Sequence, residues 1–224
     1  MRTSPKIEFV YMNIKELLHK ALTIILPLGA MMGSLCLSSC EETAEIDEYA
    51  DWKARNIEFV DSIAEVAKAN ADGKWLRILS FKLNDTDVNG EPVEYDNEEY
   101  IYCHIEAEGT DTVHPLFTDT VLVNYRGRLI PTLSYPEGRV FDQSYKGELN
   151  PATNVPTKFG VGGVVVGWST ALQHMTKGDI WRVYIPAHLA YGSSKQTDIP
   201  AYSALIFDMN LVGFYPIGTP VPNL

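Results

Sequence analysis

Positively charged side chains, histidines and cysteines are scarce in this 224-residue chain. The 18 Lys and Arg stand against 29 Asp and Glu, so the formal net charge at neutral pH is −11. Because binding to nucleic-acid phosphates requires clustered Lys and Arg, this balance argues against DNA or RNA as a partner. The five histidines are scattered, and the three cysteines are too few for a disulfide framework or a Cys-rich metal site.

Several familiar catalytic motifs are also absent. The chain has no nucleophile elbow, no Walker phosphate loop and no His-Glu-x-x-His zinc motif. The glycine-rich stretch at 160–163 is followed by valines and lacks the third glycine of a dinucleotide fingerprint. We interpret it as a turn before a short helix, and the sequence indicates neither a metal nor an organic cofactor.

Residues 1–39 have the layout of a bacterial export signal. Lys15 and Lys20 precede an apolar run over residues 21–37, as a charged segment precedes the apolar core of such signals. The run ends in Leu-Ser-Ser-Cys at 37–40, which resembles the lipobox of bacterial lipoprotein precursors. In such precursors the cysteine is acylated and begins the mature chain, so the resemblance implies lipid on Cys40.

A transmembrane helix is the alternative interpretation of this segment. Its apolar run of about 17 residues is at the short end of the roughly 17 to 25 that span a bilayer, and Pro27, Gly29 and Gly33 interrupt it. We therefore expect anchoring by lipid, at the outer membrane, on either its periplasmic or its surface side. The acidic tether at 40–46 resembles a surface-export signal of Bacteroidetes lipoproteins.

The segment 47–73 has the pattern of one amphipathic helix. Its apolar residues recur at three- and four-residue steps over 47–71, and Asp72-Gly73 ends the pattern. The apolar positions are Tyr49, Trp52, Phe59, Val60, Ile63, Val66 and Ala67. We expect this stripe to pack on its own domain, and a homodimer contact through the helix is the alternative.

Residues 74–224 change to a pattern of short strands. Alternating segments at 75–83 and 100–106 flank a polar stretch that contains the turn-forming pair Asn89-Gly90, and this pattern predicts a long hairpin. Cys103 lies in the apolar second segment and is predicted to be buried. Further strands are predicted at 122–129, 159–161, 180–185 and 204–214, and a short helix at 166–175. This arrangement predicts one α+β domain in which the helix covers one face of an antiparallel sheet.

An ordered series of motif blocks runs through these strands. The blocks are Val-Leu-Val-Asn-Tyr-Arg-Gly at 121–127, Gly-Arg-Val-Phe-Asp-Gln-Ser at 138–144, Gly-Trp at 167–168, and the stretches 175–178, 185–192 and 199–208. In order and spacing they resemble the FKBP family of peptidyl-prolyl isomerases over residues 99–214. The resemblance implies a strongly twisted antiparallel sheet wrapped around a short helix, with the site between them.

The resemblance also implies a pocket that isomerises Xaa-Pro bonds in unfolded or exported proteins. Trp168 would be its floor, and its walls would be Tyr125, Phe141, Val155, Val164, Val165, Ile199 and Phe207. The polar catalytic groups would be Asp142 near Tyr125, together with the Val165 N–H and the Tyr191 hydroxyl, which would hold substrate carbonyl oxygens. A twisted amide is less polar than a planar one, so a desolvated aromatic pocket favours the transition state without any nucleophile.

Two departures from the family pattern occur near the predicted pocket. Residues 146–156 form an insertion, and Lys146 is the candidate basic partner for Asp142. Val155 stands where a larger aromatic residue is frequent, which predicts a wider and shallower pocket. These features favour the alternative of an FKBP-fold binding or chaperone module with little turnover. A structural lipoprotein outside the family would require the ordered blocks to be coincidental.

Overall fold

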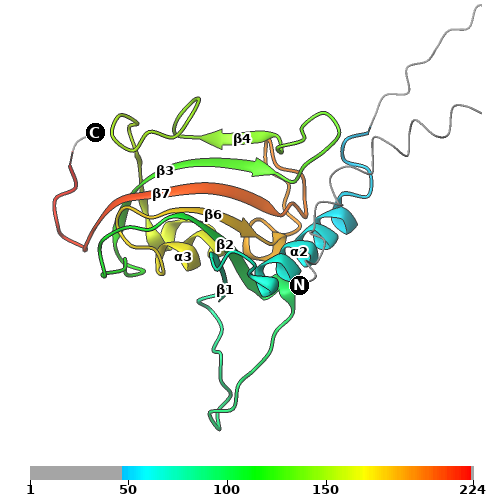
Figure 1. Cartoon of the computed structure of the whole chain (residues 1–224), viewed down its shortest axis with the longest axis horizontal. Coiled ribbons are helices and arrows are strands. Elements are labelled where there is room, and N and C mark those ends of the chain that lie inside the picture. Colours follow the sequence, from blue (N-terminus) through cyan, green and yellow to red (C-terminus); the bar gives the residue numbers. More distant parts are fainter. Residues whose placement is uncertain (1–46, 223–224) are drawn as a thin grey trace, which may run out of the picture. The chain divides into compact units, whose positions relative to one another are not determined.

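A seven-stranded antiparallel sheet organises the part of the chain that the computed structural model describes, residues 47–222 (Figure 1). Its strand order is β1-β2-β6-β7-β3-β4, and β5 pairs with β3. The strands are β1 (Trp75–Leu79), β2 (Tyr100–Ala107), β3 (Thr120–Leu129), β4 (Val140–Gln143), β5 (Thr157–Gly160), β6 (Ile180–Ile185) and β7 (Leu205–Tyr215). The predicted export signal, Cys40 and the tether lie outside the described residues.

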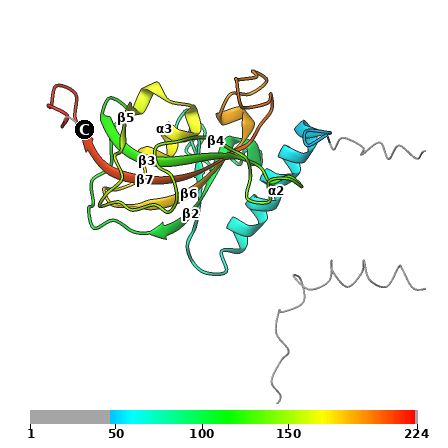
Figure 2. The same cartoon turned by 90° about the horizontal axis from the view of Figure 1, so that it is seen from above.

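Helix α3 (Val166–Leu172) packs on one face of this sheet (Figure 2). All of its residues except Val166 are buried. Along β6, Trp181, Val183 and Ile185 are buried in alternation, as expected for a strand with one face in the core. Gly167 makes close packing possible, because a Cβ there would lie 2.4 Å from Cγ2 of Ile185. The predicted α+β fold, with a short helix against an antiparallel sheet, is confirmed.

Helix α2 (Trp52–Ala69) packs on the opposite face of the sheet from α3, beside β1 and β2. Tyr184, which alternates with the α3-facing residues of β6, stacks on Trp75 at 5.7 Å between ring centroids and approaches Phe59 at 6.1 Å. Trp52, Asn56, Val60, Ala64 and Ala67 are buried. The predicted amphipathic helix is thus present, and most of its apolar stripe packs on the chain's own sheet, although Val66 is exposed.

The predicted hairpin is formed by β1 and β2, which pair antiparallel with Ile78 opposite Ile101. Strand β1 is shorter than predicted and ends at Leu79. The connection extends away from the sheet (Figure 1), turns at Gly90 with a φ of +82°, and returns through the 3₁₀ turn η1 (Asn97–Glu99). Two further 3₁₀ turns, η2 (Val161–Gly163) and η3 (Ala187–Leu189), lie before α3 and after β6.

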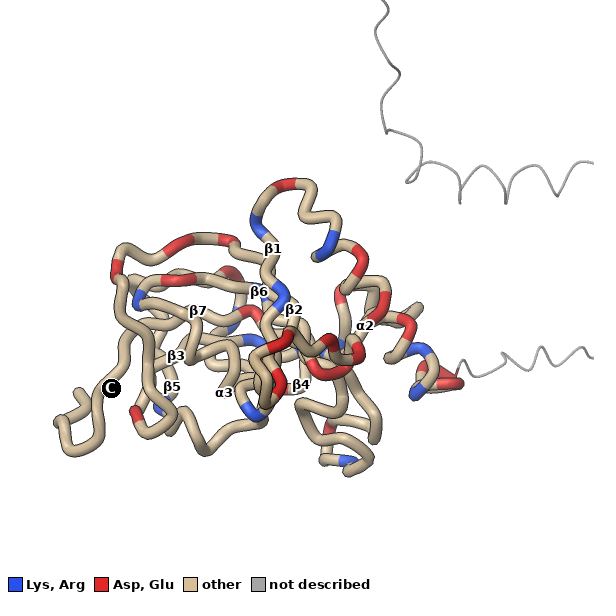
Figure 3. The backbone as a smooth tube through the Cα atoms, turned by 90° about the horizontal axis from the view of Figure 1, so that it is seen from below, with Lys and Arg blue, Asp and Glu red and all other residues tan. Residues whose placement is uncertain are grey.

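Strand β2 places Cys103 fully inside the core. Burial raises the pKa of its thiol far above the usual value, so the group stays protonated, as expected for a structural cysteine. Figure 3 shows acidic positions in the middle of α2 and basic positions towards its two ends. No helix within residues 47–222 has the length and apolarity to cross a bilayer. Over the same span, no three His, Cys, Asp or Glu side chains are grouped so that they could hold a metal ion.

Candidate active site

Aromatic rings surround Trp168 at the start of α3. Its ring lies edge-to-face with three others, at centroid distances of 5.3 Å to Tyr125, 5.3 Å to Phe159 and 5.1 Å to Phe207. Phe141 extends the cluster through Phe207 at 5.6 Å. Edge-to-face pairs contribute roughly 0.5–1.5 kcal/mol each beyond area burial. The cluster is therefore a rigid apolar surface, with Trp168 only 4% exposed beneath it.

Strand geometry explains how residues distant in sequence meet here. In β3, Gly127 pairs with Phe207 of β7 on one side and with Asp142 of β4 on the other. A Cβ on Gly127 would lie 2.5 Å from Phe141 Cζ and 2.6 Å from Phe207 Cε1. Glycine at this position therefore lets the two rings meet across β3.

A β-bulge in the β3–β4 pairing directs two neighbouring residues to the same place. The register shifts between Gly127 and Arg128, where β4 has one residue more than β3, and that residue is Phe141. In a regular strand, Phe141 and Asp142 would point to opposite faces. The bulge explains why both line one cavity.

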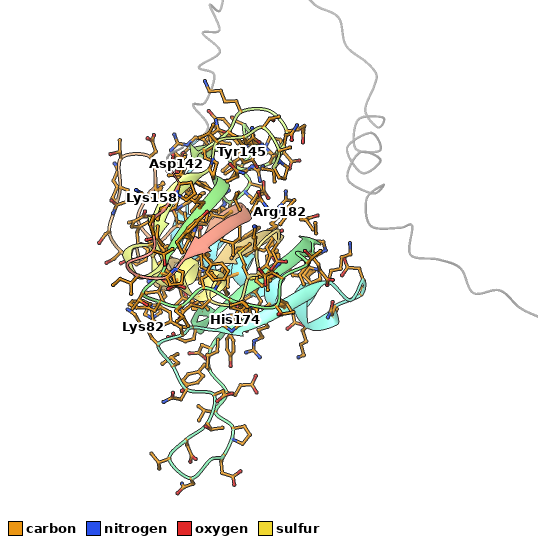
Figure 4. All side chains as sticks on the ribbon, turned by 90° about the vertical axis from the view of Figure 1, so that its left-hand side faces the viewer. Lys82, Asp142, Tyr145, Lys158, His174 and Arg182 are labelled. Atoms are coloured by element: carbon orange, nitrogen blue, oxygen red, sulfur yellow. The ribbon has the colours of Figure 1, made fainter. Side chains whose placement is uncertain are left out.

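The cavity over Trp168 has a volume of about 420 Å³, within the usual range for small-ligand pockets. It is lined by Tyr125, Phe141, Asp142, Phe159, Gly163, Val164, Val165, Trp168, Tyr191 and Phe207. In Figure 4, Asp142 lies towards one end of the domain, whereas His174 and the β1–β2 connection lie towards the other end. The structure thus brings together most of the predicted site residues around the predicted floor.

The polar edge of the cavity is the contact between Tyr125 and Asp142. The Tyr125 hydroxyl donates to Oδ2 of Asp142 at 2.7 Å, and the Gln143 N–H donates to Oδ1 at 2.8 Å. Burial, then the hydrogen bond to Asp142 and its charge, raise the pKa of Tyr125 far above its usual value. The phenol is therefore neutral at physiological pH and holds the carboxylate in place.

Several hydrogen-bond donors at this cavity, the buried Nε1 of Trp168 among them, have no protein acceptor within residues 47–222, and two of these are the donors that the family resemblance predicted. One is the backbone N–H of Val165, whose extended backbone (φ −62°, ψ 153°) precedes α3. The other is the hydroxyl of Tyr191, which lies just after η3 and is 40% exposed. Both residues line the cavity, so both donors are available to a bound peptide.

Three expectations about this region are corrected by the structure. Val155 is 63% exposed and lies outside the cavity. Phe159, on β5, provides the aromatic wall expected at Val155, so the pocket is not left open there. Ile199 is buried, but it lines a separate groove with Tyr49 and Arg139. Lys146 forms no ion pair with Asp142; the ion pairs within the described chain all involve other residues.

Phe159 and Gly163 are the cavity residues that the sequence reasoning missed. Phe159 belongs to a predicted strand, and its pairing with Val121 of β3 brings it beside the motif at 121–127. The signal that could have found it is this alternation, since Thr157 and Phe159 share one face of a strand directly before the glycine-rich turn.

Comparison with known proteins agrees with this geometry. Residues 112–212 match the family model of FKBP-type peptidyl-prolyl cis-trans isomerases. The chain contains an FKBP-type domain. It is similar to the FKBP-type peptidyl-prolyl cis-trans isomerase FkpA of Escherichia coli, with 39% identity over 117 residues, which are 52% of this chain and 38% of that protein.

Two further matches support the FKBP-type domain. The peptidyl-prolyl cis-trans isomerase Mip of Coxiella burnetii is 41% identical over 99 residues, or 44% of this chain and 38% of that protein. The crystal structure of FkpA from Escherichia coli aligns with a TM-score of 0.51 at 27% identity, covering 75% of this chain and 62% of that one. The chain thus matches 38% of the length of both curated relatives, and α2, β1 and β2 precede the residues that the family model matches.

Proposed function

We propose that this chain is a peptidyl-prolyl cis-trans isomerase that assists the folding of exported proteins. The observation that carries this proposal is the aromatic cavity over Trp168 with two unused donors, Val165 N–H and Tyr191 Oη, at its edge. The isomerase names of FkpA and Mip, which match the same part of the chain, support it.

The proposed mechanism needs no proton transfer to the substrate. A prolyl ring would lie on Trp168 between the surrounding aromatic rings, and the adjoining amide would enter a water-poor space. Because the amide loses resonance and polarity as it twists, such a space stabilises the twisted state relative to the planar one. The barrier to be lowered is roughly 18–20 kcal/mol.

Orientation of the peptide would come from the two free donors. Val165 N–H and Tyr191 Oη would bind carbonyl oxygens on either side of the rotating bond. A net contribution of about 0.5–1.5 kcal/mol per hydrogen bond corresponds to about two- to twelvefold in rate for each. Asp142, held by Tyr125, would fix the polar edge of the pocket, and desolvation would supply the remainder.

The test is an assay of cis-trans isomerisation on a series of short Xaa-Pro peptides, by coupled proteolysis or NMR exchange, with the full chain. We expect acceleration over the uncatalysed rate and a severalfold loss in Tyr191→Ala. Tyr135→Ala is the matched control, because Tyr135 is similarly exposed and lies outside the cavity. A folded chain without acceleration would instead support the alternative, an FKBP-fold binding or chaperone module.

We propose, further, that the chain is held in the cell envelope by lipid on Cys40, at the outer membrane. The motif at 37–40 and the short, interrupted apolar run before it support this. Metabolic labelling with a fatty acid, followed by membrane fractionation, tests it. Cys40→Ala is expected to lose both the label and membrane association, whereas Cys103→Ala is expected to keep both. A labelled Cys40→Ala chain would refute the assignment.

A further inference from the structure

The loop that carries Tyr191 is long and has little regular structure of its own. It joins β6 to β7 over residues 186–204 and contains only the 3₁₀ turn η3. Near Tyr191 its backbone hydrogen bonds run from Gly192 N–H to Ala187 O at 2.8 Å, from Ser194 N–H to Tyr191 O at 3.0 Å and from Tyr202 N–H to Gly192 O at 2.7 Å; the last of these ties Gly192 to residue 202. The position of Tyr191 at the cavity therefore depends on how residue 202 is held.

Tyr202 has a backbone conformation that must be maintained by its surroundings. Its φ is +62°, in the left-handed region that side chains with a Cβ rarely adopt. Such a conformation persists only where neighbouring contacts fix it. The contacts made by residues 202–204 therefore decide whether this backbone conformation is kept.

Helix α2 supplies these contacts from its first two turns. Trp52 Nε1 donates to Ser203 Oγ at 2.8 Å, and the Ala204 N–H donates to Asn56 Oδ1 at 2.7 Å, both buried. Lys53 Nζ lies 4.7 Å from the centre of the Tyr202 ring. Three consecutive loop residues are thus each held by an α2 side chain. Figure 2 shows the 186–204 loop, in orange, beside the N-terminal end of α2.

Glu48, just before α2, and Arg55, in its first turn, also hold the loop before β4, the strand that carries Phe141 and Asp142. Glu48 accepts hydrogen bonds from the backbone N–H of Ser134, at 3.1 Å, and from its hydroxyl. Arg55 donates to the Glu48 carbonyl at 2.9 Å and to the Pro131 carbonyl at 3.4 Å. Residues 48–56 therefore contact both loops that lead to the polar side of the cavity.

We propose that Trp52 and Asn56 are positioning residues for the prolyl-isomerase site. They fix residues 203 and 204, which hold the left-handed turn at Tyr202 and, through Gly192, the placement of Tyr191. Apolar packing alone would stabilise α2 on the sheet without fixing the loop. A buried indole N–H and a buried amide oxygen, by contrast, must find their partners at defined positions. This inference rests on the proposed isomerase function.

Asn56→Ala in the full chain tests the proposal most directly. We expect kcat/KM for an Xaa-Pro peptide to fall about three- to tenfold, the range expected when one substrate hydrogen bond is misplaced. We also expect faster hydrogen exchange at residues 186–204 and unchanged exchange in α3. The control is Ala64→Gly, which weakens α2 at a buried position that forms none of the hydrogen bonds to residues 203 and 204. It is expected to leave kcat/KM and exchange in the loop unchanged.

A double variant separates positioning from general destabilisation. If Asn56 acts through Tyr191, Asn56→Ala should add little to the loss caused by Tyr191→Ala. Multiplication of the two losses would overturn the proposal. Ser203→Ala removes the acceptor for Trp52 and should reproduce the effect of Asn56→Ala, with recovery in Ser203→Thr, which retains a hydroxyl.

The failure of this inference is distinguishable from the failure of the proposed function. An active wild-type chain whose kcat/KM is unchanged by both Asn56→Ala and Ser203→Ala would overturn the positioning role alone. An inactive but folded wild-type chain would overturn the isomerase function. In that case, loop exchange that is no faster in Asn56→Ala than in Ala64→Gly would also overturn the structural part of the inference.

Discussion

The region matched by the FKBP family model and the region before it contribute to this molecule in different ways. Every residue that lines the cavity lies within residues 112–212. Residues 47–107 contribute α2, β1 and β2, and none of them lines the cavity. Instead, β1 and β2 extend the sheet, and residues 48–56 hold two loops that lead to the cavity. The chemical groups of the cavity therefore all come from the matched region, whereas some of the contacts that hold its loops in place come from the segment before it.

The largest effect on the matched region is expected from Trp168→Ala. Removing a buried aromatic ring typically costs about 3–5 kcal/mol in the free energy of unfolding, and it would also remove the cavity floor. We therefore expect strong losses of both stability and isomerase activity, measured by chemical denaturation and the peptide assay. A variant that kept activity would show that the cavity is not the site.

Gly127→Ala should disturb the same cavity from the opposite side. The added Cβ would overlap the rings of Phe141 and Phe207, and such overpacking costs roughly 1–3 kcal/mol. We expect a loss of activity of about tenfold or more, corresponding to at least about 1.4 kcal/mol. Gly213→Ala on β7 is the control, since its nearest contact would be an ordinary 3.6 Å. Equal effects of the two substitutions would contradict this account.

Asp142→Leu should lower activity with little effect on stability. The carboxylate is exposed and forms no ion pair within residues 47–222, so we expect a change in unfolding free energy below about 1 kcal/mol. Because the substitution removes the carboxylate that accepts the hydrogen bond from Tyr125, kcat/KM should fall severalfold. Glu137→Leu, at an exposed acidic residue in the loop before β4, should leave both quantities unchanged. Retention of full turnover by Asp142→Leu would remove this residue from the site.

The smallest expected effect lies in the region before the matched domain and depends on pH. His104 contacts Asp72 at 2.8 Å and Glu106 at 3.0 Å. Burial lowers the pKa of its ring, but the hydrogen bonds and charges of the two carboxylates outweigh it, so the pKa is raised above 6.5. The protonated ring therefore stabilises the fold fully below about pH 6.5, and this contribution is lost as pH rises through the folded-state pKa.

His104→Gln should accordingly have a lower free energy of unfolding than wild type, and this difference should become smaller as the pH rises above about 6.5. The measurement is the free energy of unfolding from urea titrations over a range of pH. His174→Gln is the control, because the His174 ring contacts the Thr170 carbonyl and no carboxylate. Parallel pH curves for wild type and His104→Gln would contradict the assignment.

Local patterns in the sequence were sufficient to predict most of the fold. Three- and four-residue spacing predicted α2, alternation predicted β1 and β2, and further strand candidates correspond to β3, β6 and β7. The resemblance of the ordered motifs to the FKBP family predicted Trp168, Phe207 and Asp142, which all line the cavity. Strand β4 was missed because it has only four residues and contains a bulge that disturbs alternation. The insertion before β5 led to the wrong placement of Val155 in the pocket wall, because sequence spacing alone could not decide whether Val155 or Phe159 forms the aromatic wall of the cavity.

The contacts between α2 and the 186–204 loop could not be predicted from the sequence. Trp52 and Ser203 are 151 positions apart, and neither belongs to a repeating pattern that involves the other. Periodicity indicated that Trp52 would be buried, but not that its indole N–H would have a specific acceptor. Asn56 interrupts the apolar stripe, and a polar residue at a buried helical position was the one local sign of such a contact.

Strand β2 protects one edge of the sheet, and a fragment limited to the residues that the family model matches would lack it. It pairs with β6 along one edge, with Cys103 opposite Val183, and ends before residue 112. A fragment limited to residues 112–212 would leave the β6 backbone without partners on that edge. Unpaired edges of this kind associate with other chains, so we expect such a fragment to aggregate, whereas a fragment that begins before α2 retains a protected sheet.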